Sequence, residues 1–184
     1  MRKSREVAAL TREAIVATAA DHIRRNGITE TSLAGVMTSA GLTHGGFYRH
    51  FRDKEQLITE ALCGTGDDSV RMIRQAVSVG GLDAAVDSYL STSQRDAPTP
   101  VCPFAALGSE LARSGASSKA AAMEALEKMI ATLAGGKAET EERYGAILTF
   151  ATMVGAMTLA RIASNTPLSD EILDLTKAHL HEKP

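Results

Sequence analysis

The sequence predicts an all-α protein, and three observations support this fold class. Apolar residues recur three and four positions apart along most of the 184 residues, whereas no sustained run alternates apolar and polar residues as a strand would. Alanine and leucine dominate the apolar residues, and aromatic residues make up only 4% of the chain. Glycine and proline punctuate the periodic segments, as they commonly do between helices.

The first expected helix runs from Ser4 to Asn26 and ends at Gly27, a residue type that favours helix C-termini. Its buried face carries apolar residues four apart, namely Ile15, Ala19 and Ile23. A second, short helix is expected after Thr31, the predicted N-cap, and ends at Gly41. Its predicted buried residues are Leu33, Val36 and Met37.

A third helix is expected from Thr43 to His50, with Thr43 as a possible cap, although its two glycines disfavour helix by about 1 kcal/mol each. The fourth begins at Asp53, whose side chain can cap it while Gln56 reaches back. We expect a break in this helix near Gly64–Gly66 and its end at Gly80–Gly81.

The rest of the chain contains further helical patterns and one expected loop, "QRDAPTPVCP", at residues 94–103. The predicted helices cover Leu82–Ser91, Phe104–Arg113, Ser117–Leu133, Thr140–Ala163 and Ser169–His181. The apolar run Ala146–Ala160 is shorter than the roughly 20 residues that a membrane span needs, so we interpret it as a core helix.

Composition and charge narrow the class of protein. With 44% hydrophobic and 23% charged residues the balance is that of a soluble globular chain, and residues 1–25 lack the apolar core of a secretory signal. Two cysteines make no disulfide framework, which fits a cytoplasmic protein. Residues 1–60 hold nine Lys and Arg against seven Asp and Glu, a mild excess that permits a nucleic-acid contact. The segment "MRKSR" is either a solvated tail or a basic arm on DNA.

Three short helices with a tight turn between the second and third indicate a helix-turn-helix arrangement. Its recognition helix enters a DNA major groove about 12 Å wide with its N-terminal residues towards the base edges, so that these residues should be small or polar. The leading turn has this character: Thr43, His44, Gly45 and Gly46. Phe47 and Phe51 lie on the opposite face, where we expect them to anchor the helix in the core.

Polar residues beside this leading turn suit the DNA backbone. Tyr48 and His50 point away from the anchoring face, and each can donate a hydrogen bond to a phosphate oxygen. Lys54 lies in the first turn of the next helix, whose free amides and dipole also favour a phosphate.

The stretch from Thr31 to Leu57, "TSLAGVMTSAGLTHGGFYRHFRDKEQL", closely resembles the DNA-binding domain of TetR-family transcriptional regulators. The shared features are a threonine before the second helix, an alanine-glycine turn, an aromatic core pattern and a lysine opening the fourth helix. In this chain they are Thr31, Ala40-Gly41, Phe47-Tyr48-Arg49-His50-Phe51 and Lys54.

This resemblance implies a DNA-binding domain at residues 1–55 and a ligand-binding and dimerisation domain at residues 56–184. It implies a cytoplasmic homodimer, usually a repressor, that leaves a palindromic double-stranded DNA operator when a small-molecule effector binds. Carried over by position, the groove-facing residues are Thr43, His44, Gly45, Gly46 and Tyr48, and the phosphate contacts are Thr31, His50 and Lys54. The chain departs from the family at Gly45 and Gly46, where members often carry larger side chains, so direct reading rests mainly on Thr43 and His44.

The resemblance also places an effector pocket in the C-terminal part, where an apolar lining favours a hydrophobic ligand. The candidate lining residues are Tyr89, Cys102, Phe104, Leu107, Met123, Phe150, Met153 and Met157. The last two helices are expected to form the dimer interface, with small residues for close approach: Ala146, Gly155, Ala156 and Ala160. We expect no metal and no cofactor.

Three alternatives differ in what they require. An enzyme needs an activated nucleophile or a paired acid and base, and the sequence shows no such motif. A regulator that senses oxidants or electrophiles would use Cys102, because a helix start can lower the pKa of a thiol. A protein-interaction module would show no salt-dependent DNA binding.

Overall fold

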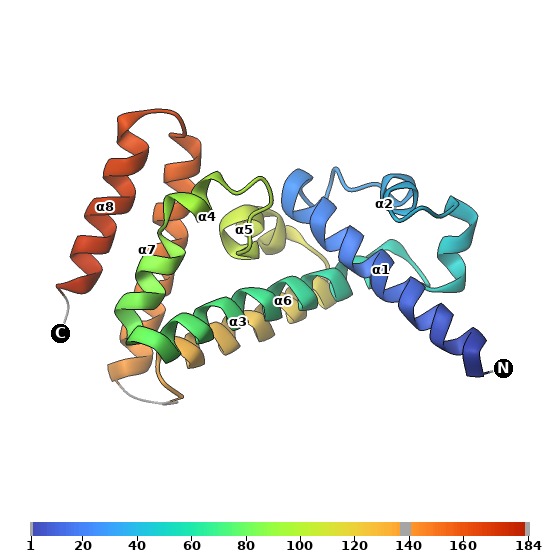
Figure 1. The fold of residues 1–184 in the computed structure, drawn as a ribbon, viewed down its shortest axis with the longest axis horizontal. Coiled ribbons are helices and arrows are strands. Elements are labelled where there is room, and N and C mark those ends of the chain that lie inside the picture. Colours follow the sequence, from blue (N-terminus) through green and yellow to red (C-terminus); the bar gives the residue numbers. More distant parts are fainter. Residues whose placement is uncertain (1, 137–140, 183–184) are drawn as a thin grey trace.

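The computed structural model describes residues 2–136 and 141–182, and every regular element in these ranges is helical. Helices α1 and α2 and the 3-10 helix η1 form one end of the molecule, while α7 and α8 form the other (Figure 1). The elements are α1 Arg2–Asn26, α2 Leu33–Ser39, η1 His44–Arg49, α3 Lys54–Tyr89, α4 Thr92–Asp96, α5 Pro103–Arg113, α6 Ala116–Leu133, α7 Glu141–Ile162 and α8 Pro167–His181. The all-α prediction is therefore confirmed.

The first apolar core lies under α1, α2, η1 and the beginning of α3. The predicted stripe of α1 is fully buried in it, with Ile15, Ala19 and Ile23 at most 1% exposed. Gly27 ends α1 with a φ of +89°, a value that glycine adopts without strain. Leu107 and Leu111 of α5 complete this core from the C-terminal part of the chain.

Helix α3 lies along α6 and connects the two ends of the molecule (Figure 1). The break expected at Gly64–Gly66 is wrong, because α3 is continuous there. A Cβ on Gly66 would lie only 2.5 Å from the Cβ of Ala125, so this glycine permits close packing between the two helices. The interruption at Gly80–Gly81 is confirmed, since both have non-helical angles and Gly81 has a φ of +71°.

The second core fills the body formed by the later part of α3, α5, α6, α7 and α8. Ala146, Ala156 and Ala160 are at most 7% exposed within it, so they pack inside the chain rather than offering the open surface expected of them, whereas Gly155 is exposed. Residues 94–103 were expected to form a loop, but the first of them belong to the short helix α4. The Ser91 hydroxyl caps this helix by accepting the Gln94 N–H.

Glu110 of α5 ties the body of the molecule to the turn between α1 and α2. The Glu110 carboxylate accepts the backbone N–H groups of Ile28 and Thr29, at 2.6 and 3.0 Å, in the turn between α1 and α2. In a second contact, the Glu55 carboxylate of α3 accepts the Ser118 hydroxyl at 3.0 Å in the first turn of α6. The first core also includes α3 residues up to Leu62, beyond the domain boundary expected at residue 55, which stays a prediction.

Helix α7 is long and apolar enough to span a membrane by length and composition alone, which core helices of soluble proteins also are. One of its faces packs into the second core, with Phe150, Met153 and Met157 each at most 4% exposed. This placement agrees with the core helix predicted from the sequence.

The close packing at Gly66 predicts a stability difference between two glycines of one helix. Gly66→Ala should lower the free energy of unfolding by about 1–3 kcal/mol, because the added methyl overpacks the α3–α6 contact. Gly64→Ala should raise it by up to about 1 kcal/mol, because Gly64 is exposed, nothing lies within 4 Å and alanine favours helix. Urea unfolding followed by circular dichroism measures both, and equal effects would contradict the packing argument.

Candidate DNA-binding site and effector cavity

Helix α2 and the turn after it position η1. Ser32 is the N-cap of α2, and its hydroxyl accepts the Gly35 N–H at 3.0 Å. Gly41 has a φ of +73° in the turn, and the Leu42 N–H donates to the carbonyl of Met37 at 2.8 Å. The chain therefore reverses sharply after α2 and presents residues 43–49 at the end of the molecule.

The predicted third helix is present as the 3-10 helix η1 rather than an α-helix. Thr43 occupies the N-cap position in an extended conformation, but its side chain makes no capping hydrogen bond. Short helices of poor propensity often adopt the tighter 3-10 geometry, and two consecutive glycines in the first turn fit this explanation. A hydrogen bond from the Phe51 N–H to the Phe47 carbonyl, at 3.1 Å, closes the segment.

Phe47 and Phe51 anchor η1 as predicted, and the candidate DNA contacts lie on the other side. The two rings stack with centroids 5.5 Å apart and are at most 2% exposed. Tyr48 is 66% exposed and leans edge-on against Phe47, with ring centroids 5.1 Å apart. Thr43, His44 and Gly45 are also exposed, and Gly46 is half-buried.

The junction between η1 and α3 has the predicted capping pattern. The Asp53 carboxylate accepts the Gln56 N–H at 2.8 Å, and the Gln56 amide oxygen accepts the Arg52 N–H at 2.9 Å. The bond from Gln56, together with Arg52, lowers the pKa of Asp53. His50 and Lys54 flank this junction and are half-buried.

Thr31 differs from its prediction in two respects. It is not the N-cap of α2, which is Ser32. Its hydroxyl donates to the carbonyl of Gly27 at 2.7 Å, and the residue is only 2% exposed. In this conformation Thr31 closes the turn after α1 and has no surface from which to contact a phosphate.

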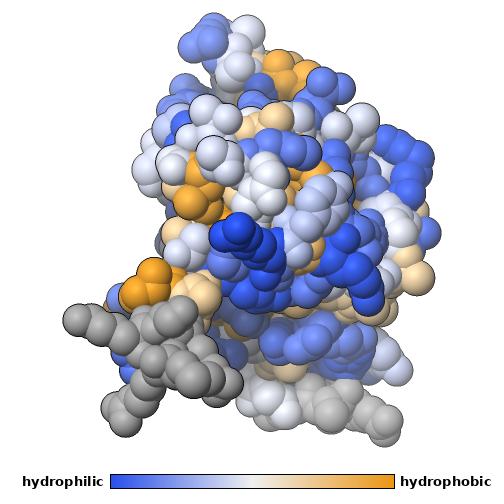
Figure 2. All heavy atoms as spheres, turned by 90° about the vertical axis from the view of Figure 1, so that its right-hand side faces the viewer, coloured by the Kyte–Doolittle hydropathy of each residue, from blue (hydrophilic) through white to orange (hydrophobic). Residues whose placement is uncertain are grey.

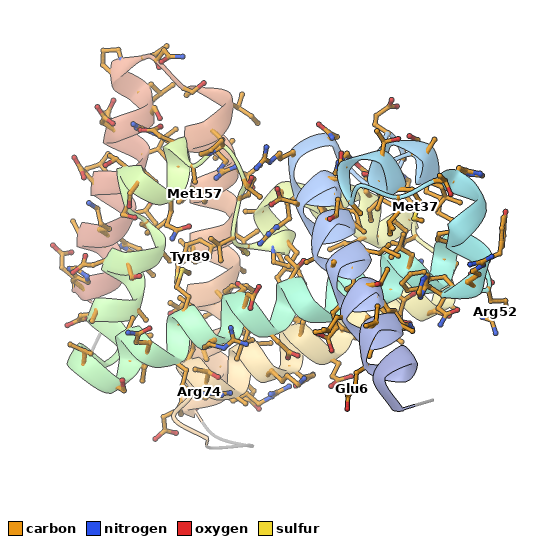
Figure 3. The ribbon with its side chains drawn as sticks, turned by 45° about the vertical axis from the view of Figure 1, so that its right-hand side comes forward. Glu6, Met37, Arg52, Arg74, Tyr89 and Met157 are labelled. Carbon is orange, nitrogen blue, oxygen red and sulfur yellow. The ribbon has the colours of Figure 1, made fainter. Side chains whose placement is uncertain are left out.

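The structure adds Arg12 and Arg52, which the sequence reasoning did not single out, to Arg49, which it had grouped with the candidate DNA contacts. The Arg12 guanidinium lies 4.7 Å from the centre of the Phe51 ring and forms an ion pair with Glu60, so it ties α1 to η1 and α3. Arg49 and Arg52 are exposed beside the candidate DNA contacts, and Figure 3 shows Arg52 pointing outward at this end. The basic cluster "RHFRDK" signalled the last two, whereas nothing local signalled Arg12.

The face at this end is largely hydrophilic, with only scattered hydrophobic residues (Figure 2). The side chains of residues 1–5, including the basic segment proposed as an arm, lie outside the part of the molecule that the structure describes. Within the described part, the site is an exposed leading turn flanked by Tyr48, Arg49 and Arg52 above two buried rings.

Most of the predicted effector residues do meet in the second core (Figure 3 labels Tyr89 and Met157). Phe150 is packed edge-to-face with both Tyr89 and Phe104, at centroid distances of 6.2 and 5.6 Å. Met153 and Met157 lie in the same core.

Two predicted effector residues lie elsewhere. Leu107 is buried in the first core, because it lies on the face of α5 that packs against the helix-turn-helix rather than on the face that packs against the second core. Met123 is 54% exposed on α6 and belongs to neither core. Their apolar character alone could not tell a pocket from another core or from the surface.

A small cavity of about 10 Å³ adjoins this cluster, roughly the room that one water needs. Its lining includes Tyr89, Cys102 and Met157, and also Arg161, which sequence reasoning missed. The Tyr89 hydroxyl is buried without a hydrogen-bond partner, and burial raises its pKa well above the usual value. The body therefore contains unsatisfied polar atoms of Tyr89 and Arg161 around this small space.

Cys102 occupies the N-cap position of α5, yet its thiol is not activated. Burial raises the pKa of the Cys102 thiol and outweighs the nearby Tyr89 hydroxyl and the amides of Ala105 and Phe104, which lower it. The lowering of the thiol pKa expected from a helix start is therefore wrong for Cys102, because the thiol is buried. Burial also raises the pKa of Cys63, helped by the carboxylates of Glu124 and Asp67.

Comparisons with known proteins agree with this arrangement. Residues 15–61 match the family model described as bacterial regulatory proteins, tetR family. The HTH-type transcriptional regulator AcrR of Shigella flexneri is 37% identical over 59 residues, which cover 32% of this chain and 27% of that protein. The chain thus spans about a quarter of that relative.

Solved structures extend the likeness to the whole fold. The reduced form of E. coli NemR superposes with a TM-score of 0.77 at 21% identity, covering 92% of this chain and 95% of that one. A TetR transcriptional regulator from Chloroflexus aurantiacus gives a TM-score of 0.68 at 26% identity, covering 100% and 98%. With its N-terminal helix-turn-helix and its C-terminal helical body, the chain has the fold of these TetR regulators, and its residues 15–61 carry the helix-turn-helix of the tetR family of bacterial regulatory proteins.

Proposed function

We propose that the protein is a repressor that binds a palindromic operator as a homodimer and releases it when a small molecule binds the body. The observation that carries this proposal is the exposed leading turn of η1, which presents Thr43, His44 and Gly45 beyond a firmly buried Phe47. A recognition helix needs such a rigid base and a free, small leading turn to approach base edges. Acting on DNA, the protein would work in the cytoplasm.

The dimer would form through α7 and α8. These helices expose large apolar side chains that no part of the described chain covers: Leu148, Leu159, Ile162, Leu168 and Leu175, each at least 54% exposed. Exposed apolar surface of this extent commonly marks an interface. A two-fold dimer would also set two recognition helices one DNA turn apart, roughly 34–36 Å.

Effector release requires that the ligand favour a conformation in which these two helices no longer match the operator. Because the space beside Tyr89 is only about 10 Å³, a ligand there must displace side chains of the second core or of residues 97–102. Such a displacement would reach α5 and α3, which both continue into the first core.

Footprinting and fluorescence anisotropy on the DNA upstream of the gene test DNA binding directly. The full chain should protect a palindrome, and its affinity should fall steeply with salt because lysine and arginine displace counterions from phosphates. A folded dimer that protects no site in this DNA would contradict the proposal.

Gly46→Val tests the close approach of η1 to DNA. A Cβ at Gly46 would meet only ordinary contacts, at 3.8 Å from Met37 and 3.9 Å from Thr43, so the fold should remain. Operator affinity should fall at least about ten-fold, because an added side chain holds the backbone away from the bases. Gly108→Val, at an open helical position on α5, is the matched control. Unchanged operator affinity in Gly46→Val would refute the argument.

A thiol-responsive regulator is the second candidate. The geometry in its favour is that the backbone amides of Phe104 and Ala105 face the Cys102 sulfur, and would stabilise a thiolate once residues 97–102 opened. Cys102→Ser should then abolish operator release by peroxide or quinone while leaving DNA binding intact. If the variant still releases DNA under these reagents, Cys102 is not the sensor.

A further inference from the structure

A cleft of about 390 Å³ lies where the end of α1 meets the body. Arginines from both parts line it, Arg24 and Arg25 from α1 and Arg161 from α7. Its other lining residues are Pro98, Pro100, Ala105, Ala106, Thr158 and Ile162. Pro100, Ala105 and Arg161 also line the small cavity beside Tyr89, so cleft and cavity adjoin.

Two of these guanidinium groups have hydrogen-bonding capacity left over. The Nε atoms of Arg24 and Arg161 are both buried without a partner. Arg161 satisfies one other nitrogen by donating to the carbonyl of Gln94 at 2.6 Å, and Arg24 has only a long ion pair of 3.4 Å with Asp21. Because a guanidinium has five N–H donors, each group also keeps terminal N–H groups beyond these contacts, and a ligand that enters the cleft can accept from them.

The cleft also has an excess of positive charge. Among the residues that the structure describes, no aspartate or glutamate lines it. Asp21 forms ion pairs with both Arg24 and Arg25, at 3.4 and 2.9 Å, and Asp96 pairs with Arg95, at 2.7 Å. One carboxylate thus serves two of the three arginines, and Arg161 has no ion pair within the described part of the chain. Burial lowers the pKa of Arg161, as expected for a cation that lacks a close counter-ion.

We propose that this cleft binds a small organic carboxylate, whose oxygens accept from Arg24 and Arg161 and whose apolar part lies against Pro98, Pro100 and Ile162. Arginine suits carboxylates because its planar fork can donate two parallel hydrogen bonds. The cleft volume lies within the range of sites for small organic ligands. The ligand would join α1 of the DNA-binding domain directly to α7 of the body.

Calorimetric titration of the full chain, without DNA, tests the site. Benzoate and octanoate are the probes, and benzamide and octanamide are their uncharged counterparts. At least one carboxylate should bind with an affinity at least about ten-fold above that of its amide, the gain expected for a charge-assisted bond. Binding of neither carboxylate, or equal binding of acid and amide, would overturn the proposal.

Variants locate the binding. Arg24→Met and Arg161→Met should each weaken carboxylate binding about ten-fold or more, whereas Arg113→Met, which removes an exposed arginine of α5 outside the cleft, should not. Arg161→Lys keeps the charge and loses the fork, so it should also weaken binding if Arg161→Met fails to fold. Unchanged affinity in the folded arginine variants would refute the site.

The role of this ligand as effector rests on the proposed function, and operator binding is measured separately. If the chain binds the operator but neither carboxylate, the cleft proposal is wrong and the repressor proposal stands. If it binds a carboxylate but no operator, the cleft proposal stands and the repressor proposal falls.

Discussion

The contact on which the arrangement of the molecule depends is the Glu110 carboxylate, held by the amides of Ile28 and Thr29. It joins α5, which belongs to the body, to the turn on which α2 and η1 are built. A Cβ on Gly27 would lie 2.4 Å from a carboxylate oxygen of Glu110 and would force that side chain to move, and the φ of +89° at Gly27 also favours glycine. Each such bond to a charged group contributes about 1.5–3 kcal/mol. The orientation of the recognition helix is therefore set partly from the body.

The recognition element itself relies on packing rather than helical propensity. Gly45 and Gly46 disfavour helix, and the segment adopts one short 3-10 stretch. What holds it is the stacked pair Phe47 and Phe51, covered by the Arg12 guanidinium. Because these buried rings hold the segment in place, the leading turn can carry small side chains and still be rigid, as an element that enters a DNA groove requires.

The sequence predicted the helices and the helix-turn-helix well, because periodicity, caps and positive-φ glycines are local signals. Gly41 and the Asp53–Gln56 pattern are examples. The sequence-based prediction was wrong where a contact with a distant residue determines the role of a position. Gly66 was interpreted as a helix breaker, whereas the structure shows that it allows α3 to pack closely against Ala125 of α6. The predicted pocket lining was partly wrong for the same reason. Leu107 and Met123 are apolar like the other lining residues, and only the fold shows that one lies in the first core and the other on the surface. Arg161 was missed because a single arginine at the end of an apolar run reads as an ordinary surface charge.

These placements suggest how a signal would travel between the two ends. Tyr89 lies beyond the non-helical residues Gly80 and Gly81, so the long helix α3 is not one rigid lever from the cavity to Lys54. Helix α5 offers a shorter path, since its first turn borders the cavity and Glu110 in its later turns holds the α1–α2 turn. A ligand between Arg24 and Arg161 would contact the end of α1 and the first turns of α5, and so would act on the same contact between the body and the DNA-binding end. Coupling through α5 and the end of α1 therefore requires no movement of the kinked part of α3.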